Sequence, residues 1–592
     1  MKFPYGISDF KEIVTNNYFY CDRTEKIPFL EESKSILFLR PRRFGKSLLL
    51  SMLANYYDVA LADQFEDIFG NTRIGKNPTK RRNSYFILKW DFSCVDPAGA
   101  PAEIRQSLYD HINDRIKAFV AYYKNYIDQD IEINPDNALS SMESLLGAIR
   151  NAPHPVYLLI DEYDNFANEV MTGSRKEPGA YESLVYGDGL LQTLFKAVKA
   201  AASESLFERT FITGVSPVAM SDITSGYNIA ENIYLEPEFN DLCGFCENEI
   251  QDAVNRVADS RGMIKKEAAA ALEMMRSYYN GYAFSPGAKS NVYNPTLCLY
   301  FLKRLEKNRA YPDNMLDANL ATDDEKLHYI SRLMEGEQLI LDLIAEKNSV
   351  SVPKLEDRFG IRQMREAGSG DVSFIASFLY YFGILTMAGK TKFGEFRLCV
   401  PNLVVQGLYV ERIGKMLLPE PQARDAGMFA AKKLYQENDI KPICEFIEKK
   451  FFAVFSNRDY RWANELTVKT AFLTLLYNDI LYMMDSEAEI EKTFTDLTMI
   501  IRPDMRRFEI SDILLEFKFV TLKDAGLTGD QAKKMAPQEL ENVAGMRLKM
   551  EEAMTRLGHY GDALERKHGN LRLKRFAVVS LGFERLWAKP YP

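Results

Sequence analysis

Cysteine, net positive charge and long apolar runs are all scarce in this 592-residue sequence. The seven cysteines are scattered and odd in number, which excludes a disulfide-rich miniprotein and predicts reduced, mostly buried thiols in a cytosolic protein. Lys and Arg total 74 against 83 Asp and Glu, which gives a net charge of −9. A protein that coats nucleic acid along its whole length is usually basic, so any such contact should be local.

Long hydrophobic segments are also missing. The longest apolar runs, 471–477 and 480–484, are separated by Asn478 and Asp479 and fall short of the roughly 20 residues that a membrane span requires. The first residues contain no apolar core of a signal peptide. We therefore expect a cytoplasmic protein with no membrane partner. At about 150 residues per domain, the length predicts three or four domains.

The pattern of strand and helix signals divides the chain. In residues 1–235 the two alternate, which predicts an α/β domain with a parallel sheet. Residues 236–415 are mainly helical and then form a two-stranded hairpin, which fits a helical lid or a winged-helix-like region. Residues 416–440, with two prolines in Leu418-Pro419-Glu420-Pro421, are predicted as a connector, and residues 441–592 again mix strands and helices. The strands expected in the first part are 35–39, 85–92, 156–160 and 210–213.

A phosphate-binding loop is indicated between the first strand and the following helix, where the sequence is Arg40-Pro41-Arg42-Arg43-Phe44-Gly45-Lys46-Ser47. In such a loop the backbone N–H groups hold phosphates, the Lys reaches the β- and γ-phosphate oxygens, and the Ser binds Mg²⁺. We therefore expect ATP and Mg²⁺ at this loop. Arg42 and Arg43 would neutralise phosphate charge or remain solvated, and Arg40 stands where the pattern has its first glycine.

Two acids follow the apolar strand 156–160. Because ligands bind at the carboxyl edge of a parallel sheet, Asp161 is predicted to hold the Mg²⁺ shell and Glu162 to polarise the attacking water. Thr213 and Ser216 follow the next strand, where they either sense the γ-phosphate or cap a turn. The residues predicted to contact the nucleotide are Arg42, Arg43, Phe44, Gly45, Lys46, Ser47 and Asp161.

Several blocks together resemble the predicted AAA-ATPase-like family of bacteria. They are Gly6-Ile7-Ser8-Asp9-Phe10, Tyr20-Cys21-Asp22-Arg23-Thr24, Leu39 through Ser47, Ile160-Asp161-Glu162-Tyr163-Asp164, Thr213-Gly214-Val215-Ser216, Tyr279-Asn280-Gly281-Tyr282 and Tyr293-Asn294-Pro295. In that family the phosphate loop usually reads as it does here, Arg40 included. The resemblance implies an AAA-like P-loop ATPase domain in residues 1–235, and it implies a PD-(D/E)XK nuclease-like domain at the carboxyl end.

The candidate nuclease-like site lies in residues 513–520, an apolar run that contains two charged residues, Glu516 and Lys518. Residues i and i+2 of a strand share a face, and two charges on an apolar strand are costly unless they are paired or bind a metal. If 497–501 is the antiparallel neighbour, a turn centred on residue 506 places Asp496 opposite Glu516. Asp496 is therefore preferred over Asp504 of the Pro503-Asp504 dipeptide.

The C-terminal part, 441–592, is thus predicted as an α/β restriction-endonuclease-like domain. Asp496 and Glu516 would hold Mg²⁺, and Lys518 would complete a site for nucleic-acid phosphodiester cleavage. Glu465 resembles the additional acid that such nucleases carry on their first helix. A structural salt bridge on a hairpin is the alternative explanation of these charges.

Three functions remain open from the sequence. The first is an ATPase that controls a DNA- or RNA-cleaving site. The second is a nucleotide-dependent switch whose nuclease-like domain is inactive and only binds nucleic acid or protein. The third is a nucleotidyl or phosphoryl transferase that acts on a small molecule. Many P-loop ATPases complete their site with an Arg from a neighbouring subunit, so a homo-oligomer is also considered, although no Arg here can be assigned that role.

Overall fold

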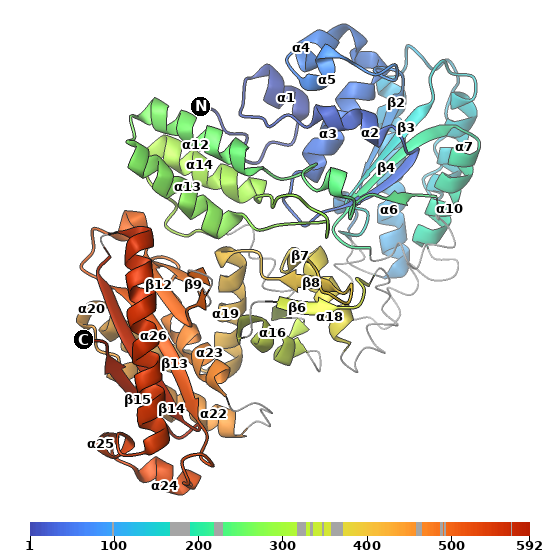
Figure 1. Ribbon diagram of the computed structural model, residues 1–592. Helices are drawn as coiled ribbons and strands as arrows, with labels where there is room; N and C mark the ends of the chain where they lie inside the picture. The colour runs from blue at the N-terminus through green and yellow to red at the C-terminus, as the bar shows by residue number, and fades with distance from the viewer. Residues whose placement is uncertain are drawn as a thin grey trace.

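Two five-stranded sheets, one toward each end of the chain, organise the computed structural model (Figure 1). In Figure 1 the first sheet is blue to cyan and the second is orange to red, with helices and a small third sheet between them. The structure describes residues 1–96, 100–165, 190–217, 229–316, 327–328, 330–331, 336–345, 349–356, 371–457, 464–485, 489–490, 493–569 and 571–592. In these segments no helix is both long enough and apolar enough to cross a bilayer.

The N-terminal sheet is parallel, with the strand order β2-β3-β4-β1-β5. Strands β1 and β3 are buried along their whole length, as expected for a parallel sheet covered on both faces. The four predicted strands are confirmed, whereas the two-residue β5 is too short to leave a sequence signal. The strands are β1 (Ser35–Leu39), β2 (Phe86–Asp91), β3 (Val156–Asp161), β4 (Phe207–Gly214) and β5 (Glu231–Asn232).

Helices cover this sheet and supply the crossovers between its strands. They are α1 (Phe10–Thr15), α2 (Ile27–Leu30), α3 (Lys46–Tyr57), α4 (Phe65–Phe69), α5 (Arg73–Lys76), α6 (Pro101–Tyr122), α7 (Ala138–Ile149) and α10 (Leu190–Ser203). The polar loops at the carboxyl ends of β1 and β3 lie at the same edge of the sheet, on either side of β4, because β4 pairs in parallel with both strands.

A bundle of three helices follows, with a hydrophobic core of its own. Its helices are α12 (Glu247–Arg261), α13 (Lys265–Tyr279) and α14 (Pro295–Asn308). Beyond it lie α16 (Gly336–Ala345), β6 (Ser349–Val352), α18 (Val372–Tyr381), β7 (Thr386–Lys390), β8 (Phe396–Cys399) and α19 (Leu403–Leu417). The expected hairpin is present as β7 and β8, and β6 joins it in an antiparallel sheet of order β6-β8-β7. The winged-helix assignment itself stays a prediction.

The predicted connector, 416–440, is instead mostly a helix, α20 (Pro421–Glu437). Pro421 lies in the first turn of this helix, where the missing N–H has no cost, so it starts the helix and does not mark a loop. The helix packs against α23 (Glu465–Leu476). Gly427 permits the close approach, since a Cβ there would lie 2.6 Å from Leu475 Cδ2.

The C-terminal sheet has the order β15-β14-β13-β12-β9. Its strands pair antiparallel, except that β13 and β14 are parallel and joined by the long helix α26. The strands are β9 (Tyr482–Asp485), β12 (Leu497–Ile501), β13 (Asp512–Val520), β14 (Leu573–Leu581) and β15 (Arg585–Pro590), and a separate hairpin joins β10 (Glu489–Ile490) to β11 (Thr493–Phe494). The remaining helices are α21 (Lys441–Phe446), α22 (Phe452–Asn457), α24 (Gly529–Lys534), α25 (Pro537–Leu540) and α26 (Ala544–His568).

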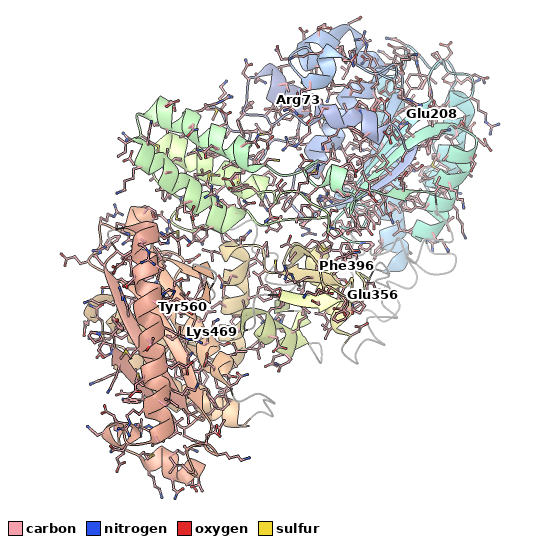
Figure 2. The ribbon with its side chains drawn as sticks, in the orientation of Figure 1. Arg73, Glu208, Glu356, Phe396, Lys469 and Tyr560 are labelled. Atoms are coloured by element: carbon pink, nitrogen blue, oxygen red, sulfur yellow. The ribbon has the colours of Figure 1, made fainter. Side chains whose placement is uncertain are left out.

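The two faces of this sheet carry different helices. Phe517 of β13 packs on Phe472 of α23, with ring centroids 4.9 Å apart. Leu514 and Val520, on the opposite face, share a core with residues of α26. Figure 2 shows α26 lying along the sheet, with Tyr560 labelled on it and Lys469 labelled on α23. Glu516 and Lys518 have the parity of Leu514 and Val520, so they lie on the α26 face.

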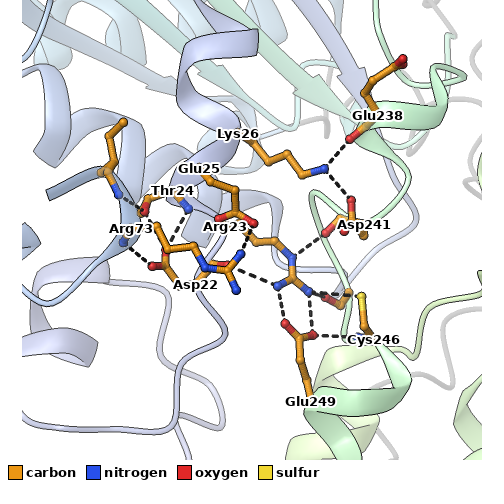
Figure 3. A network of polar contacts seen from close by, with 12 residues as sticks. Asp22, Arg23, Thr24, Glu25, Lys26, Arg73, Glu238, Asp241, Cys246 and Glu249 are labelled. Carbon is orange, nitrogen blue, oxygen red and sulfur yellow. Dashed lines mark hydrogen bonds and ion pairs between the residues drawn. The ribbon is translucent and has the colours of Figure 1, made fainter. Parts of the chain in front are cut away.

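The three-helix bundle contacts both larger units. Toward the first, Arg23 donates to both carboxylate oxygens of Glu249 in α12 and, 2.7 Å away, to the carbonyl of Asp241 (Figure 3). Toward the second, the buried Arg502 donates to the carbonyls of Pro312 (2.9 Å) and Asp313 (3.3 Å), just beyond α14. The bundle therefore links the N-terminal sheet and its helices to the C-terminal sheet.

Candidate functional site

The phosphate loop connects β1 to α3, as predicted. Gly45 caps α3 with φ +93°, a backbone conformation that glycine adopts without strain. Arg43 has φ +64°, which an L-residue rarely adopts, and such strain gathers at functional sites. The Lys46 ammonium donates to the carbonyls of Arg40 (2.9 Å) and Pro41 (3.1 Å), so the lysine lies folded into its own loop.

Arg40 is a structural residue. Its side chain is 1% exposed and lies between two aromatic rings, 4.4 Å from the Phe38 centroid and 4.1 Å from that of Phe284. Its guanidinium also donates to the carbonyls of Tyr234 (3.0 Å) and Phe239 (2.7 Å). The residue at the first-glycine position is therefore buried and anchors the loop to later segments.

The loop is also covered from the bundle side. Phe44 is buried, and its ring meets those of Tyr282 and Phe284 edge-on, with centroids 4.9 and 5.2 Å away. The hydroxyl of Thr296, in the first turn of α14, donates to the carbonyl of Arg43 at 2.9 Å. The loop therefore depends on the bundle for its conformation.

The acids after β3 lie at the same edge of the sheet. The Thr213 hydroxyl donates to Asp161 Oδ1 at 2.7 Å, which fixes that carboxylate from the neighbouring strand. Glu162 has φ +49°, another strained position. Ser216 contributes its N–H (2.8 Å) and its hydroxyl (3.0 Å) to Asp164, so it caps that carboxylate. Thr213 thus touches a predicted site residue directly, whereas Ser216 acts on a neighbour.

Burial and opposite charge set the electrostatics of this edge. Burial lowers the pKa of Lys46, and the charges of Glu162 and Asp161 partly restore it. Burial raises the pKa of Glu162, helped by the charge of Asp161 and opposed by Lys46 and Arg42. A carboxyl with a raised pKa beside a lysine is suited to accept a proton from water.

A cavity of about 350 Å³ opens beside the loop. Arg43, Lys46, Ser47 and Glu162 line its polar end. Its remaining wall is mostly apolar and comes from the N-terminal segment, α3, the segment before α12 and the start of α14, including Ile7, Phe19, Met52, Leu242 and Leu299. Arg42 lies outside this cavity and donates to Asn165 at 2.9 Å. A phosphate-binding end joined to an apolar wall fits a nucleotide.

The second predicted cluster is also brought together. Leu497 pairs with Leu515, which extends to Asp496 opposite Glu516. Lys518 Nζ lies 3.1 Å from Glu516 Oε1, 3.3 Å from Glu465 Oε1 and 4.0 Å from Asp496 Oδ2. Asp496 Oδ2 also accepts the N–H of Phe517 at 2.7 Å.

The charges of this cluster are strongly perturbed. Glu516 is fully buried, and burial together with the charge of Asp496 raises its pKa to about 7, against the opposing effect of Lys518. Burial raises the pKa of Glu465 as well. The three carboxylates outweigh burial at Lys518 and raise its pKa, so this side chain is an ammonium cation at neutral pH and not a base.

One acceptor in this cluster is unsatisfied. Glu516 Oε2 is buried with no hydrogen-bond partner. Leaving such an atom unpaired costs about 1–3 kcal/mol, so a ligand that takes it is favoured. Within the described part of the chain, no three His, Cys, Asp or Glu side chains are already arranged to hold a metal ion.

Comparison with known proteins bears on the N-terminal part. Residues 4–224 match the family model described as Predicted AAA-ATPase. This match supports a P-loop ATPase-like assignment for that part of the chain. A relative described as an uncharacterized protein in the vnfD 5′ region of Azotobacter chroococcum mcd 1 is 25% identical over 548 residues, which are 90% of this chain and 92% of the relative.

Three solved structures are similar at low TM-scores. The Walker-type ATPase PABY2304 of Pyrococcus abyssi has a TM-score of 0.39 and 15% identity, over 66% of this chain and 95% of that one. The Aeropyrum pernix ORC1 protein in complex with DNA has a TM-score of 0.26 and 10% identity, over 69% and 98%. The Aeropyrum pernix ORC2 protein has a TM-score of 0.30 and 11% identity, over 68% and 93%.

The structure adds one residue that the sequence did not indicate. Arg556, on α26, places Nη1 3.1 Å from Glu516 Oε1. The number of residues between Glu516 and Arg556 does not predict this contact. The rotation of α26 about its axis determines which side chain of the helix faces Glu516. Asp504 lies outside the cluster and binds Arg502 at 2.9 Å, which agrees with the preference for Asp496.

The cysteines are free, and all seven lie in described segments. Burial raises the pKa values of the Cys243 and Cys246 thiols to about 11, which keeps both protonated at neutral pH. Fewer thiols are buried than expected: Cys243, Cys298 and Cys444 are buried, Cys94 is exposed, and the other three are partly exposed.

Proposed function

We propose that the cavity beside the phosphate loop binds ATP with Mg²⁺ and hydrolyses it. Lys46, Ser47 and Glu162 line this cavity, and the buried Asp161 ends β3 immediately before Glu162; this arrangement carries the proposal. The Ser47 hydroxyl and the Asp161 carboxylate are hard oxygen donors of the kind Mg²⁺ prefers, so these residues fit the ion. When bound, Mg²⁺ neutralises charge on the β- and γ-phosphates.

The residues of the chain have distinct roles in this hydrolysis. Lys46 leaves its two loop carbonyls and binds phosphate oxygens, and Thr213 holds Asp161 in place. The oxygen of water forms a bond to the γ-phosphorus while the bond from that phosphorus to the β,γ-bridging oxygen breaks. The proton of the water passes to Glu162, and the products are ADP and inorganic phosphate.

Lys46→Met tests this proposal, with the exposed Lys34→Met as the matched control. Removing a positioned charge from the phosphates should lower phosphate release by about 100-fold or more. Lys34→Met should leave the rate unchanged. Normal turnover in Lys46→Met would refute the assignment of the loop, and a product other than ADP and phosphate, detected by mass spectrometry, would favour a transferase.

We further propose that the C-terminal cluster is a Mg²⁺-dependent PD-(D/E)XK nuclease-like site that acts on nucleic-acid phosphodiesters. The buried carboxylate of Glu516, with an unpaired oxygen beside Asp496, carries this proposal. Asp496 and Glu516 would hold Mg²⁺, which when bound polarises the phosphodiester and lowers the pKa of water. Lys518 stabilises negative charge on the phosphate. Water attacks phosphorus and gives its proton to Glu465, while the bond to the leaving sugar oxygen on the opposite side breaks and that oxygen takes a proton from solvent water.

The experiment is a cleavage assay on single- and double-stranded DNA and RNA with Mg²⁺ or Mn²⁺, with and without ATP. Glu516→Gln should abolish cleavage, whereas the exposed Glu509→Gln should not. A requirement for ATP would show that the two sites are coupled. The ion-paired arrangement of Lys518 favours the second candidate, a nucleotide-dependent switch with an inactive nuclease-like domain. ATP hydrolysis without cleavage of any of these substrates would support that candidate.

A further inference from the structure

Arg556 is the exposed cation of the C-terminal cluster. Its side chain is 46% exposed, whereas Glu516 is fully buried and Lys518 is 3% exposed. It reaches Glu516 from α26, and its second nitrogen lies 3.7 Å from Glu552, one helical turn earlier. The guanidinium therefore stands at the entrance to the carboxylates, one turn of α26 from the labelled Tyr560 (Figure 2).

Two cations share a single oxygen of Glu516. Lys518 Nζ and Arg556 Nη1 are each 3.1 Å from Oε1, while Oε2 has no partner. Lys518 has two further carboxylates within 4.0 Å and is enclosed by protein. Of the two cations, Arg556 is the one that can leave without exposing buried structure.

The chemistry of arginine determines what could draw it away. A planar guanidinium binds a phosphate group with two parallel hydrogen bonds, which a single carboxylate oxygen does not provide. Arg556 is more exposed than Glu465 (37%) and Asp496 (18%), so a nucleic-acid backbone that approaches the cluster from the α26 side meets this guanidinium first. The departure of Arg556 leaves Glu516 with one cation fewer, so that Oε1 is paired with Lys518 alone and less positive charge opposes a divalent cation at the unpaired Oε2.

We propose that Arg556 is an exchangeable positioning residue, which pairs with Glu516 in the free protein and moves to a nucleic-acid phosphate on binding, so that Glu516 can take a divalent cation. This inference rests on the proposed nucleic-acid site. It makes cation binding and nucleic-acid binding mutually favourable, because each removes the same obstacle to the other.

The test uses the full chain without nucleotide and measures Mn²⁺ binding by electron paramagnetic resonance, with and without a short DNA duplex. The site is defined as the Mn²⁺ binding that is present in the wild type and absent in Glu516→Gln. In the wild type, DNA should increase the affinity of this site for Mn²⁺ by about five-fold or more, which is the lower end of the coupling measured between linked sites. In Arg556→Gln, Mn²⁺ alone should bind more tightly, DNA should bind more weakly, and the coupling should vanish.

Arg547→Gln is the matched control. Arg547 is exposed and lies nine residues earlier on α26, which places it on the opposite face of the helix. It should leave both affinities and their coupling unchanged. Arg556→Lys should retain part of the DNA affinity, because it keeps the charge and loses the planar fork.

The opposite directions of the two effects separate exchange from a structural role. If Arg556→Gln weakens Mn²⁺ binding and DNA binding together, or changes neither affinity, the inference is refuted. A wild type without Glu516-dependent Mn²⁺ binding also refutes it. Coupling in the wild type without strand cleavage would leave the exchange standing and refute only the nuclease proposal.

Discussion

Replacing Arg502 by Met should loosen the contact between the bundle and the C-terminal sheet. Arg502 is fully buried and donates to the carbonyls of Pro312, Asp313 and Asp479, and at 2.9 and 3.2 Å to the carboxylate of Asp504. Methionine has a similar length but no donors, so it would leave the acceptor atoms of all four residues without these bonds. Pro312 and Asp313 lie on the bundle side and Asp479 and Asp504 in the C-terminal unit, so the loss loosens both the interface and the end of β12 beside it.

The size of the effect follows from these contacts. Breaking a buried ion pair costs about 3–5 kcal/mol, and we take the lower end because the Asp504 side chain is 22% exposed. About 3 kcal/mol corresponds to roughly a 150-fold increase in the population of the state in which this region around Arg502 is open. Asp504→Asn, which keeps the shape and removes the charge, should have a smaller effect.

Amide hydrogen exchange is the suitable assay, because a chain of several units unfolds in more than one step and has no single free energy of unfolding. Exchange at the amide of Arg502, which donates to the carbonyl of Leu481, should accelerate by about 100-fold in Arg502→Met when measured by mass spectrometry. The exposed Arg507→Met is the control. Protection in Arg502→Met within about five-fold of the wild type would refute the reasoning.

Two further predictions concern the two sites. Thr213→Val keeps the volume of the side chain and removes the hydroxyl that holds Asp161. The rate of ATP hydrolysis should fall by about ten-fold, which corresponds to the loss of one hydrogen bond, while nucleotide affinity stays nearly unchanged. An equal loss of hydrolysis rate and of nucleotide affinity would contradict this prediction. The pKa of Glu516 is near 7, and a proton must leave before a cation binds, so Mn²⁺ affinity should fall about ten-fold per pH unit below 7. A flat titration between about pH 5 and 8 would contradict that assignment.

The backbone part of both sites could be predicted from the sequence. The strand period of two residues and a turn centred on residue 506 predicted the pairing of Asp496 with Glu516, because register follows from these two quantities. The phosphate loop was found from its place between a buried strand and a helix. These are local features of the chain, so local patterns reveal them.

The features that were missed depend on how elements pack. The rotation of α26 brings Arg556 to Glu516, and no spacing in the sequence records it. The sequence pattern predicts a connector around Pro421, although proline is equally common in the first turn of a helix, where the structure has it. The function of Arg40 also depends on distant segments, since its carbonyl partners lie almost 200 residues later in the chain.

That last arrangement limits how this protein can be divided or recombined. The family match ends at residue 224, but Arg40 relies on Tyr234, Phe239 and Phe284, all of which lie beyond that limit. A fragment that ends at residue 224 would keep the phosphate loop but would lose the two carbonyls and the aromatic ring that contact the Arg40 guanidinium. That buried cation would then have no partners from these residues. Recombination that exchanged one side of this boundary alone would break the same contacts. The ATPase-like part is therefore not a portable module, and residues on both sides of the boundary should be inherited together.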